Sequence, residues 1–336
     1  MNNSSQLNNE RPLVTFALFA FNQEQYIREA IEGAFSQTYQ PLEIILSDDK
    51  SSDRTFEIMQ EMAAEYKGPH RVFVRQSVEN CGLINHILEV AHESNGEYIV
   101  VAAGDDISQN YRTSLTITEM QKNNLDVLSA CSIEISQNSN QVIGKRGAVT
   151  IIQDIWLKNS PNILQIHGAT AAYRRSFLLA IPLPVKKTFL EDTAFRILAF
   201  WMQKKVGVMN ESLILYRIDG NNISPKGLRS KIKTYDHEKI LCKYYERLTE
   251  TLNYLKYCQK ILNESKLKLV HDYPINDMAI EYALLRANWL TSTFRQRIRL
   301  FQISSNFDSP RRDKLRLLGI HLYSILIKMF EKARHL

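Results

Sequence analysis

The sequence predicts an α/β fold, with a doubly wound, mostly parallel sheet flanked by helices and followed by a C-terminal helical extension. Two observations support this prediction. Within residues 12–103, short apolar runs of strand length alternate with segments whose apolar residues recur every three or four positions. From about residue 230 onward, only the helical period remains. Alternating strands and helices imply right-handed βαβ crossovers, which place the strands parallel in one sheet.

Four strands and three helices are expected in the N-terminal part. The strands are short apolar runs at Val14–Ala20, Leu42–Leu46, Arg71–Val74 and Tyr98–Ala103. The helices lie between them, and each has an apolar face, at Tyr26–Gln37, Thr55–Tyr66 and Leu83–His92. Because ligands bind outside the carboxyl ends of such strands, three loops are expected to meet at one functional edge: Phe21–Gln25, Asp48–Asp53 and Gly104–Ser108.

The pattern is looser after residue 109. We expect strands at Asp126–Ile135 and Leu213–Leu215, a polar turn region at Val142–Gly147 and a helix at Thr188–Trp201. The remainder predicts three helices, at Ile232–Leu262, Ile275–Arg299 and Asp313–Arg334. Three regions follow: a disordered polar N-terminus (1–11), a sheet domain (12–224) and a basic helical region (225–336).

Composition is that of an ordinary soluble protein, but the charge is uneven. The 336 residues are 44% hydrophobic and 23% charged, with a net charge of +6. Residues 1–224 hold 20 Lys/Arg against 25 Asp/Glu, whereas residues 225–336 hold 22 against 11. The sequence has no signal-peptide pattern, no apolar run near the ~20 residues that span a bilayer, and four scattered cysteines. We therefore expect a cytoplasmic protein with reduced thiols.

An adjacent carboxylate pair, Asp105 and Asp106, follows the last of these apolar runs and Gly104. Two charges at the end of a buried strand are costly unless water, a cation or a partner meets them. A divalent cation that holds a diphosphate uses carboxylate and phosphate oxygens, so a metal site explains the pair. A solvated loop with an N-capping aspartate explains it equally well at this point.

Two further loops at the same edge offer ligand-binding groups. Asp49 follows the second strand, and its carboxylate can accept the imide N–H of uracil or thymine, or a ribose hydroxyl. Helix capping by Asp53 or Ser52 would leave Asp49 unexplained. Phe21 and Asn22 follow the first strand, where an aromatic ring can stack on a base, although packing of Phe21 in the core is an equal alternative.

Two later acidic segments allow both structural and chemical interpretations. Glu191 and Asp192 open the expected helix, where the helix dipole alone favours acids. Alternatively, one of them is the general base that deprotonates an acceptor hydroxyl. Beyond Leu213–Leu215, Arg217 can pair with phosphate and Asp219 can reach a cation, unless this polar run is only a loop.

The C-terminal residues 309–336 are dense in both basic and apolar side chains. We favour a basic amphipathic helix that lies on an anionic membrane, with a terminal helix packed on the domain as the alternative. No nucleic-acid-binding module is recognisable in the sequence, so nucleic acid is not an expected partner.

Taken in order, these segments resemble a family 2 glycosyltransferase with the GT-A fold. The resemblance covers about residues 12–224 and rests on an ordered set of short matches: Val14–Asn22, Ala34–Tyr39, Glu43–Asp49, Ser51–Thr55, Gly96–Ile99, Gly104–Asp106, His167–Thr170, Glu191–Asp192 and Tyr216–Arg217.

The resemblance implies a nucleotide-sugar donor, a manganese or magnesium ion on its diphosphate, and an inverting displacement at the anomeric carbon. It implies that Asp49 contacts the base and that Asp105 and Asp106 form the metal motif. It further implies that Asp192, ahead of Glu191, is the catalytic base.

This chain departs from the family pattern at two positions. The acid that usually stands two places before Asp105 is replaced by Ala103, and the histidine that often stands two places after the Tyr-Arg pair is replaced by Asp219. Either Asp219 binds the cation in place of the histidine, or the role of the histidine is absent from this chain.

The expected function is that of a bacterial-type hexosyltransferase, peripheral on the inner face of the cell membrane, that acts on a glycan or lipid-linked acceptor. Its product would be lipopolysaccharide, capsule or another surface polysaccharide. A non-catalytic nucleotide-sugar-binding or scaffold protein on the same fold is the competing interpretation. A nucleotidyltransferase is a third, but the early phosphate loop rich in glycine and lysine that it requires is absent from the sequence.

Overall fold

The computed structural model describes residues 11–136, 139–147, 151–159, 161–218, 235–265, 269 and 273–304. The described residues fall into two compact units. The first lies within Met1–Ile152, Ile163–Asp219 and Cys258–Asp272, and the second within Gln153–Asn162, Gly220–Tyr257 and Tyr273–Leu336. The predicted N-terminal tail up to residue 10 and the predicted helix Asp313–Arg334 lie outside the described residues. None of the helices in the described part is long and apolar enough to cross a lipid bilayer.

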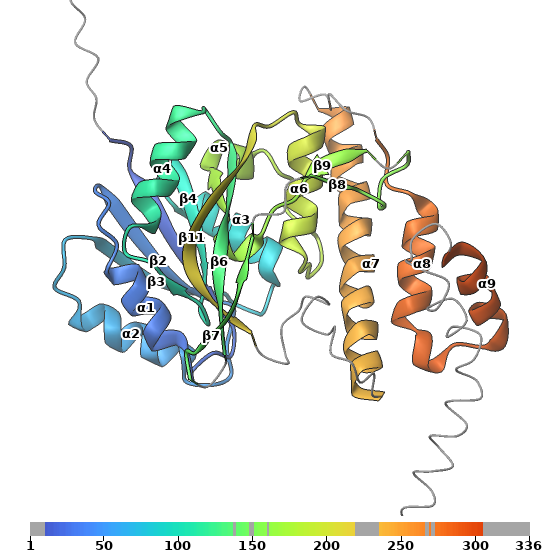
Figure 1. The fold of residues 1–336 in the computed structure, drawn as a ribbon, viewed down its shortest axis with the longest axis horizontal. Helices are drawn as coiled ribbons and strands as arrows, with labels where there is room; N and C mark the ends of the chain where they lie inside the picture. Colours follow the sequence, from blue (N-terminus) through green and yellow to red (C-terminus); the bar gives the residue numbers. More distant parts are fainter. Residues whose placement is uncertain are drawn as a thin grey trace, which may run out of the picture. The chain divides into compact units, whose positions relative to one another are not determined.

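The first unit is built on one large sheet whose paired length is mostly parallel (Figure 1). Four parallel neighbours confirm the predicted strands, in the order β3 (Arg71–Gln76), β2 (Leu42–Asp48), β1 (Val14–Ala20) and β4 (Tyr98–Ala103). A second parallel pair joins β6 (Val127–Ser136) and β11 (Val206–Ile218). Every residue of β1 is buried, as expected for a strand covered on both faces.

Short antiparallel strands complete the sheet. β10 (Ala172–Arg174) lies between β4 and β6, β5 (Ile107–Ser108) pairs with β11, and β7 (Val142–Arg146) pairs with β6. A separate two-stranded sheet joins β8 (Ile151–Gln153) and β9 (Asn162–Leu164).

Helices cover both faces of the large sheet. Helices α1 (Ile27–Phe35), α2 (Thr55–Glu65) and α4 (Arg112–Lys122) share one apolar core with Phe16 and Leu18 of β1. The opposite face carries α3 (Leu83–Glu93), α5 (Arg175–Leu179), the 3-10 turn η1 (Gly168–Thr170) and α6 (Glu191–Trp201). On this face Phe19 packs edge-on against His86 of α3 at 4.9 Å, and Tyr173 against Phe195 of α6 at 5.3 Å. Successive side chains of β1 point to opposite faces of the sheet, so this strand contributes to a core on each face.

The second unit contains its own small core. Most of α7 (Tyr235–Glu264) belongs to this unit, together with α8 (Asp277–Ala287), the 3-10 turn η3 (Trp289–Thr291) and α9 (Phe294–Ser304). The buried residues of the core are Tyr282, Trp289, Leu300 and Ile303.

Two sequence predictions of secondary structure are wrong. The region Val142–Gly147 is not a turn, because Val142–Arg146 forms β7 against β6. The predicted helix Ile275–Arg299 is interrupted after α8. A reciprocal capping box starts α9, in which the backbone N of Thr293 donates to Gln296 Oε1 (2.7 Å) and the backbone N of Gln296 to Thr293 Oγ1 (3.3 Å).

Candidate active site

The carboxyl ends of β2, β1 and β4 lie next to one another, because Ala20 pairs with Asp48 and Phe19 pairs with Ala103. The three predicted loops therefore share one edge of the sheet. The turn after β4 needs its glycine: a Cβ on Gly104 would lie 2.5 Å from Gln23 Oε1 and 2.8 Å from the Cβ of Ala20. The prediction that these three loops meet at one edge of the sheet is confirmed.

The carboxylate pair lies in the turn between β4 and β5. Asp105 is half-buried and Asp106 is 4% exposed. One oxygen of Asp106, Oδ1, accepts a hydrogen bond from the backbone N of Arg217 at 2.9 Å. The other, Oδ2, is buried and has no hydrogen-bond partner among the described residues. Burial, followed by the charge of Asp105, raises the pKa of Asp106 well above its ordinary value.

This arrangement fits a divalent cation. A buried carboxyl oxygen without a partner is costly, and a hard cation that takes carboxylate oxygens would satisfy it. Within the described part of the chain, no three His, Cys, Asp or Glu side chains form a ready ligand set. Asp105 and Asp106 would therefore need oxygens from a ligand to complete the coordination. Asp219, the third predicted metal ligand, lies outside the described residues.

The loops after β1 and β2 are bound to each other by a ladder of hydrogen bonds. Asn22 Oδ1 accepts from the backbone N of Ser52 at 2.8 Å, and the backbone N of Asn22 donates to Ser51 Oγ at 2.8 Å. The backbone N of Gln23 then donates to Thr55 Oγ1 at 2.8 Å. Asn22 has φ +52°, a left-handed conformation that asparagine tolerates well.

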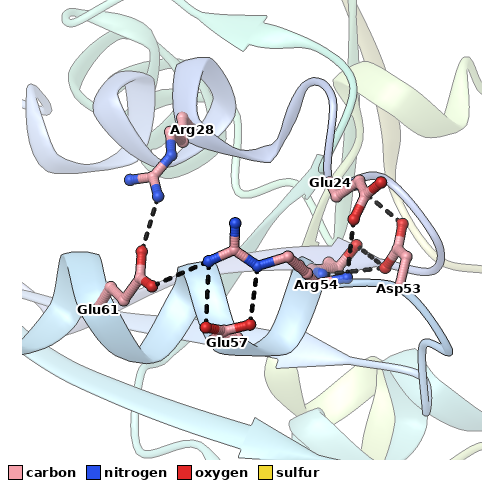
Figure 2. Close-up of polar contacts among 7 residues, drawn as sticks. Glu24, Arg28, Asp53, Arg54, Glu57 and Glu61 are labelled. Atoms are coloured by element: carbon pink, nitrogen blue, oxygen red, sulfur yellow. Dashed lines mark hydrogen bonds and ion pairs between the residues drawn. The ribbon is translucent and has the colours of Figure 1, made fainter.

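Figure 2 shows how charged groups extend this connection onto helices α1 and α2. Glu24 Oε2 accepts from the backbone N of Arg54 at 3.0 Å, and Asp53 Oδ2 from the backbone N of Glu24 at 3.1 Å. Further along α2, Glu61 accepts from Arg28 of α1 at 2.7 Å. Hydrogen bonds and charged groups therefore join the two loops at the edge of the sheet.

The predicted base-binding residues occupy different environments. Phe21 is 46% exposed, so it does not pack in the core. Asp49 is 5% exposed; its Oδ1 accepts from the backbone N of Cys81 (2.8 Å) and its Oδ2 from that of Gly82 (3.1 Å). Burial raises the pKa of Asp49, and these hydrogen bonds oppose that effect. A carboxylate offers about four lone-pair sites, so these contacts and the Cys81 thiol at 3.2 Å leave room for a further donor.

Glu191 and Asp192 form the first turn of α6, and both are half-buried. Asp192 Oδ1 accepts from the backbone N of Thr193 at 2.6 Å. Glu191 Oε1 occupies the space that a Cβ on Gly168 would fill. Burial, and secondarily the charge of Asp192, raises the pKa of Glu191 to about 8.

A chain of contacts joins these acids to the carboxylate pair. Gly168 follows His167, whose ring meets that of Tyr216 edge-on at 5.2 Å. The charges of Asp106 and Asp105, after the larger effect of burial, raise the pKa of Tyr216. Tyr216 therefore lies between the carboxylate pair and the turn that receives Glu191.

The segment before α6 also contacts the Asp49 region. The carbonyl of Thr188 accepts from the backbone N of Ile84 at 3.1 Å, and it would lie 2.8 Å from a Cβ on Gly82. Gly82 has φ +82°, so glycine is required there for conformation as well as for space. The turn at Gly82 therefore contacts both Asp49, the predicted contact of the nucleotide base, and the segment that precedes Glu191 and Asp192.

Arg217, the predicted phosphate contact, is 3% exposed, and its guanidinium binds groups of its own chain. It donates to Glu29 Oε2 at 3.2 Å, Asn140 Oδ1 at 2.6 Å and the Asp105 carbonyl at 2.9 Å. A phosphate contact would require it to leave these partners, and this contact remains a prediction.

The sequence reasoning missed Arg146 and Arg112. Arg146, at the end of β7, lies over the ring of Tyr216 at 5.5 Å, and its strand had been predicted as a turn. Arg112 is completely buried in α4 and donates to Ser108 Oγ and to the carbonyls of Val101 and Ala169. Its charge favours the ionised form of Asp106. The sequence of an amphipathic helix does not indicate when one of its arginine side chains points into the core.

Two comparisons with protein sequences were informative about the family. The sequence profile of Glycosyl transferase family 2 matches residues 15–181. An uncharacterised protein of Mycobacterium tuberculosis is 41% identical over 88 residues, 26% of this chain and 25% of that protein, so the chain spans about a quarter of this curated relative. An uncharacterised glycosyltransferase of Haemophilus influenzae is 27% identical over 278 residues, 77% of this chain and 81% of its own.

Solved structures share the fold. TarS 1–349 of S. aureus, in complex with UDP-GlcNAc, has a TM-score of 0.51 at 13% identity and covers 86% of this chain and 79% of its own. The mannosyltransferase PcManGT of Pyrobaculum calidifontis, in complex with GDP-Man and Mn²⁺, has a TM-score of 0.52 at 14% identity, over 96% of this chain and 83% of its own. The profile match and the sequence relatives place the chain in glycosyltransferase family 2, and the solved structures show that it has the GT-A fold.

Proposed function

We propose that this protein transfers a hexosyl group from a nucleotide-sugar donor to a hydroxyl of a glycan or lipid-linked acceptor, with inversion at the anomeric carbon. The observation that carries the proposal is the partnerless buried oxygen of Asp106 beside Asp105. It lies at a sheet edge that also carries Phe21, Asn22 and Asp49. The complexes of TarS with UDP-GlcNAc and of PcManGT with GDP-Man and Mn²⁺ support a donor of this class.

In this proposal Asp105 and Asp106 would hold a divalent cation, manganese or magnesium, and Asp219 is a third candidate ligand. When bound, such a cation stabilises negative charge on the leaving diphosphate. Phe21 and Asn22 contact the nucleotide, and Asp49 accepts a hydrogen bond from its base. Arg146 is the candidate for a direct phosphate contact, because it lies on Tyr216 close to the carboxylate pair.

Asp192 is the favoured general base and Glu191 is the alternative. The carboxylate accepts the proton of the acceptor hydroxyl while its oxygen bonds to the anomeric carbon. The bond from that carbon to the diphosphate oxygen breaks on the opposite face, and its electron pair leaves with the nucleoside diphosphate. Attack opposite the leaving group produces the inversion.

The biological setting is proposed by analogy with bacterial members of the family. The product would be a surface polysaccharide such as lipopolysaccharide or capsule. The protein would act in the cytoplasm, held at the inner face of the membrane by the basic and apolar residues of 309–336. We further propose that residues 12–224 are the catalytic domain and residues 225–336 the basic helical region.

A donor panel tests the proposed activity. The full chain is incubated with UDP-, GDP- and dTDP-sugars, with and without Mn²⁺, and release of nucleoside diphosphate is measured alongside the melting temperature. We expect one donor to be consumed in a metal-dependent way. If nucleotides raise the melting temperature but no donor turns over with any acceptor tested, a nucleotide-sugar-binding scaffold replaces the proposed enzyme.

A further inference from the structure

Arg217 joins segments that are far apart in sequence. It lies near the end of β11, and its side chain is 3% exposed. Its Nε donates to the carbonyl of Asp105 at 2.9 Å, and its two terminal nitrogens donate to Asn140 Oδ1 at 2.6 Å and Glu29 Oε2 at 3.2 Å. These partners come from the β4–β5 turn, the β6–β7 turn and α1.

The same residue also orients the second carboxylate. The backbone N of Arg217 donates to Asp106 Oδ1 at 2.9 Å, and Asp106 Oδ2 is the buried oxygen without a partner. Arg217 therefore fixes the main chain of Asp105 with its side chain and the carboxylate of Asp106 with its main chain.

The partners of Arg217 hold one another in turn. Asn140 Nδ2 donates to Glu29 Oε2 at 2.9 Å, and the guanidinium lies over the ring of Tyr26 at 4.8 Å. A planar guanidinium that is stacked and hydrogen-bonded on several edges has little freedom to rotate. Moving the guanidinium toward a ligand would break its ion pair with Glu29, in which the Arg217 side chain is buried.

We infer that Arg217 is a positioning residue that holds the Asp105–Asp106 turn in its cation-binding geometry, and that it is not a ligand of the donor phosphates. The inference rests on the proposed function of the carboxylate pair. It replaces the expected phosphate contact of Arg217 with a role that exists before any ligand binds. The two roles can be separated because only a positioning residue affects the turn in the free protein.

The test compares the full-length wild type with Arg217→Ala and Arg217→Lys. Arg174→Ala is the matched control: Arg174 also pairs with a glutamate, Glu97 at 2.8 Å, and lies over a ring, Tyr98 at 4.9 Å, but at the opposite end of β4. Hydrogen–deuterium exchange is measured on the ligand-free proteins for a peptide that covers residues 103–108. Binding of Mn²⁺ alone is measured by electron paramagnetic resonance.

We expect Arg217→Ala to accelerate exchange in residues 103–108 at least tenfold and to weaken Mn²⁺ binding at least tenfold. Arg217→Lys should recover part of both, and Arg174→Ala should change neither. Unchanged exchange and unchanged Mn²⁺ affinity in Arg217→Ala, with weaker binding of UDP or GDP, would overturn the inference in favour of a phosphate contact.

Asn140→Ala keeps the inference testable if Arg217→Ala does not fold. It removes one partner of the guanidinium and should accelerate exchange in residues 103–108 by a smaller factor; no change there would contradict the inference. A wild-type chain that binds no Mn²⁺ would contradict the proposed metal site instead, while the exchange measurement would still decide the role of Arg217.

Discussion

Glu191 and Asp192 are adjacent in sequence but differ in what surrounds them. Glu191 Oε1 lies beside Gly168, and Asp192 Oδ1 accepts a hydrogen bond from the backbone N of Thr193. Burial, and after it the charge of Asp192, disfavours the ionised form of Glu191. These two effects outweigh the hydrogen bonds from the backbone N–H groups of Glu191 and Asp192, so the pKa of Glu191 is raised to about 8. At neutral pH Glu191 is therefore mostly protonated, and this supports Asp192 as the proposed base.

The raised pKa of Glu191 predicts a specific pH dependence of stability. The folded protein keeps the Glu191 proton up to about pH 8, whereas an unfolded chain loses it near pH 4.5. Its contribution to the free energy of unfolding is therefore fully present below pH 4.5 and is lost as the pH rises to about 8. Glu191→Gln cannot ionise, so we expect this variant to become more stable than the wild type as the pH rises from 5 to 9. Urea denaturation across that range measures the difference.

The matched control for this prediction is Glu32→Gln, because Glu32 is an exposed glutamate on α1. Its stability should follow that of the wild type at every pH. If the curve of Glu191→Gln also runs parallel to that of the wild type, the pKa of Glu191 is not raised in the folded protein.

At the scale of elements, the turn η1 and the first turn of α6 approach closely at residue 168, which is glycine. Any Cβ there would occupy the position of Glu191 Oε1. The carboxyl group of Glu191 would have to move, whereas the Cβ of Asp192, 3.6 Å from the same point, would be in ordinary van der Waals contact. This close approach fixes where the carboxyl group of Glu191 can lie relative to η1.

We therefore expect Gly168→Ala to lower kcat at least tenfold, with a stability loss of about 1–3 kcal/mol from overpacking. Steady-state kinetics and urea denaturation measure the two effects. Gly147→Ala is the matched control, since none of the described residues has an atom within 4 Å of a Cβ at that position. A Gly168→Ala variant with wild-type kcat would show that the first turn of α6 does not take part in the reaction.

The elements that were predicted correctly are those whose local pattern and topology agree. The four parallel strands are short apolar runs, and the βαβ order alone brings Asp49 and Asp105 to one edge.

The partners of Arg217 could not be predicted, because Asn140 and Glu29 lie in other elements and are 77 and 188 residues away in sequence. Helix α4 was missed because threonines and charges dilute its apolar face. Strand β7 was missed because its exposed residues have no core to pack against.

At the scale of the whole molecule, the acidic sheet domain and the basic C-terminal region predict different partners. The carboxylates of the sheet edge suit a cation and a polar donor, whereas the excess of Lys and Arg after residue 224 suits an anionic surface. Residues 305–336 lie outside the described part of the chain, so their role is argued from sequence alone.

Deletion of residues 310–336 should release the protein from liposomes that contain anionic lipid, because both the basic charge and the apolar stripe are lost. Liposome sedimentation at low and physiological salt measures the binding. Neutral liposomes serve as the control surface. Binding to anionic liposomes that is unchanged by the deletion would contradict the membrane role of this segment.

The account depends most on the carboxylate pair, and Asp105→Ala tests it directly. Asp126→Ala is the matched control, because Asp126 precedes β6 at the opposite end of the sheet and caps the backbone N of Lys205 at 3.0 Å. Release of nucleoside diphosphate is measured with the donor that the wild type consumes, at saturating Mn²⁺. We predict that Asp105→Ala lowers the rate at least a thousandfold while its melting temperature stays near that of the wild type, and that Asp126→Ala remains active. Full activity in Asp105→Ala would contradict the proposed cation site.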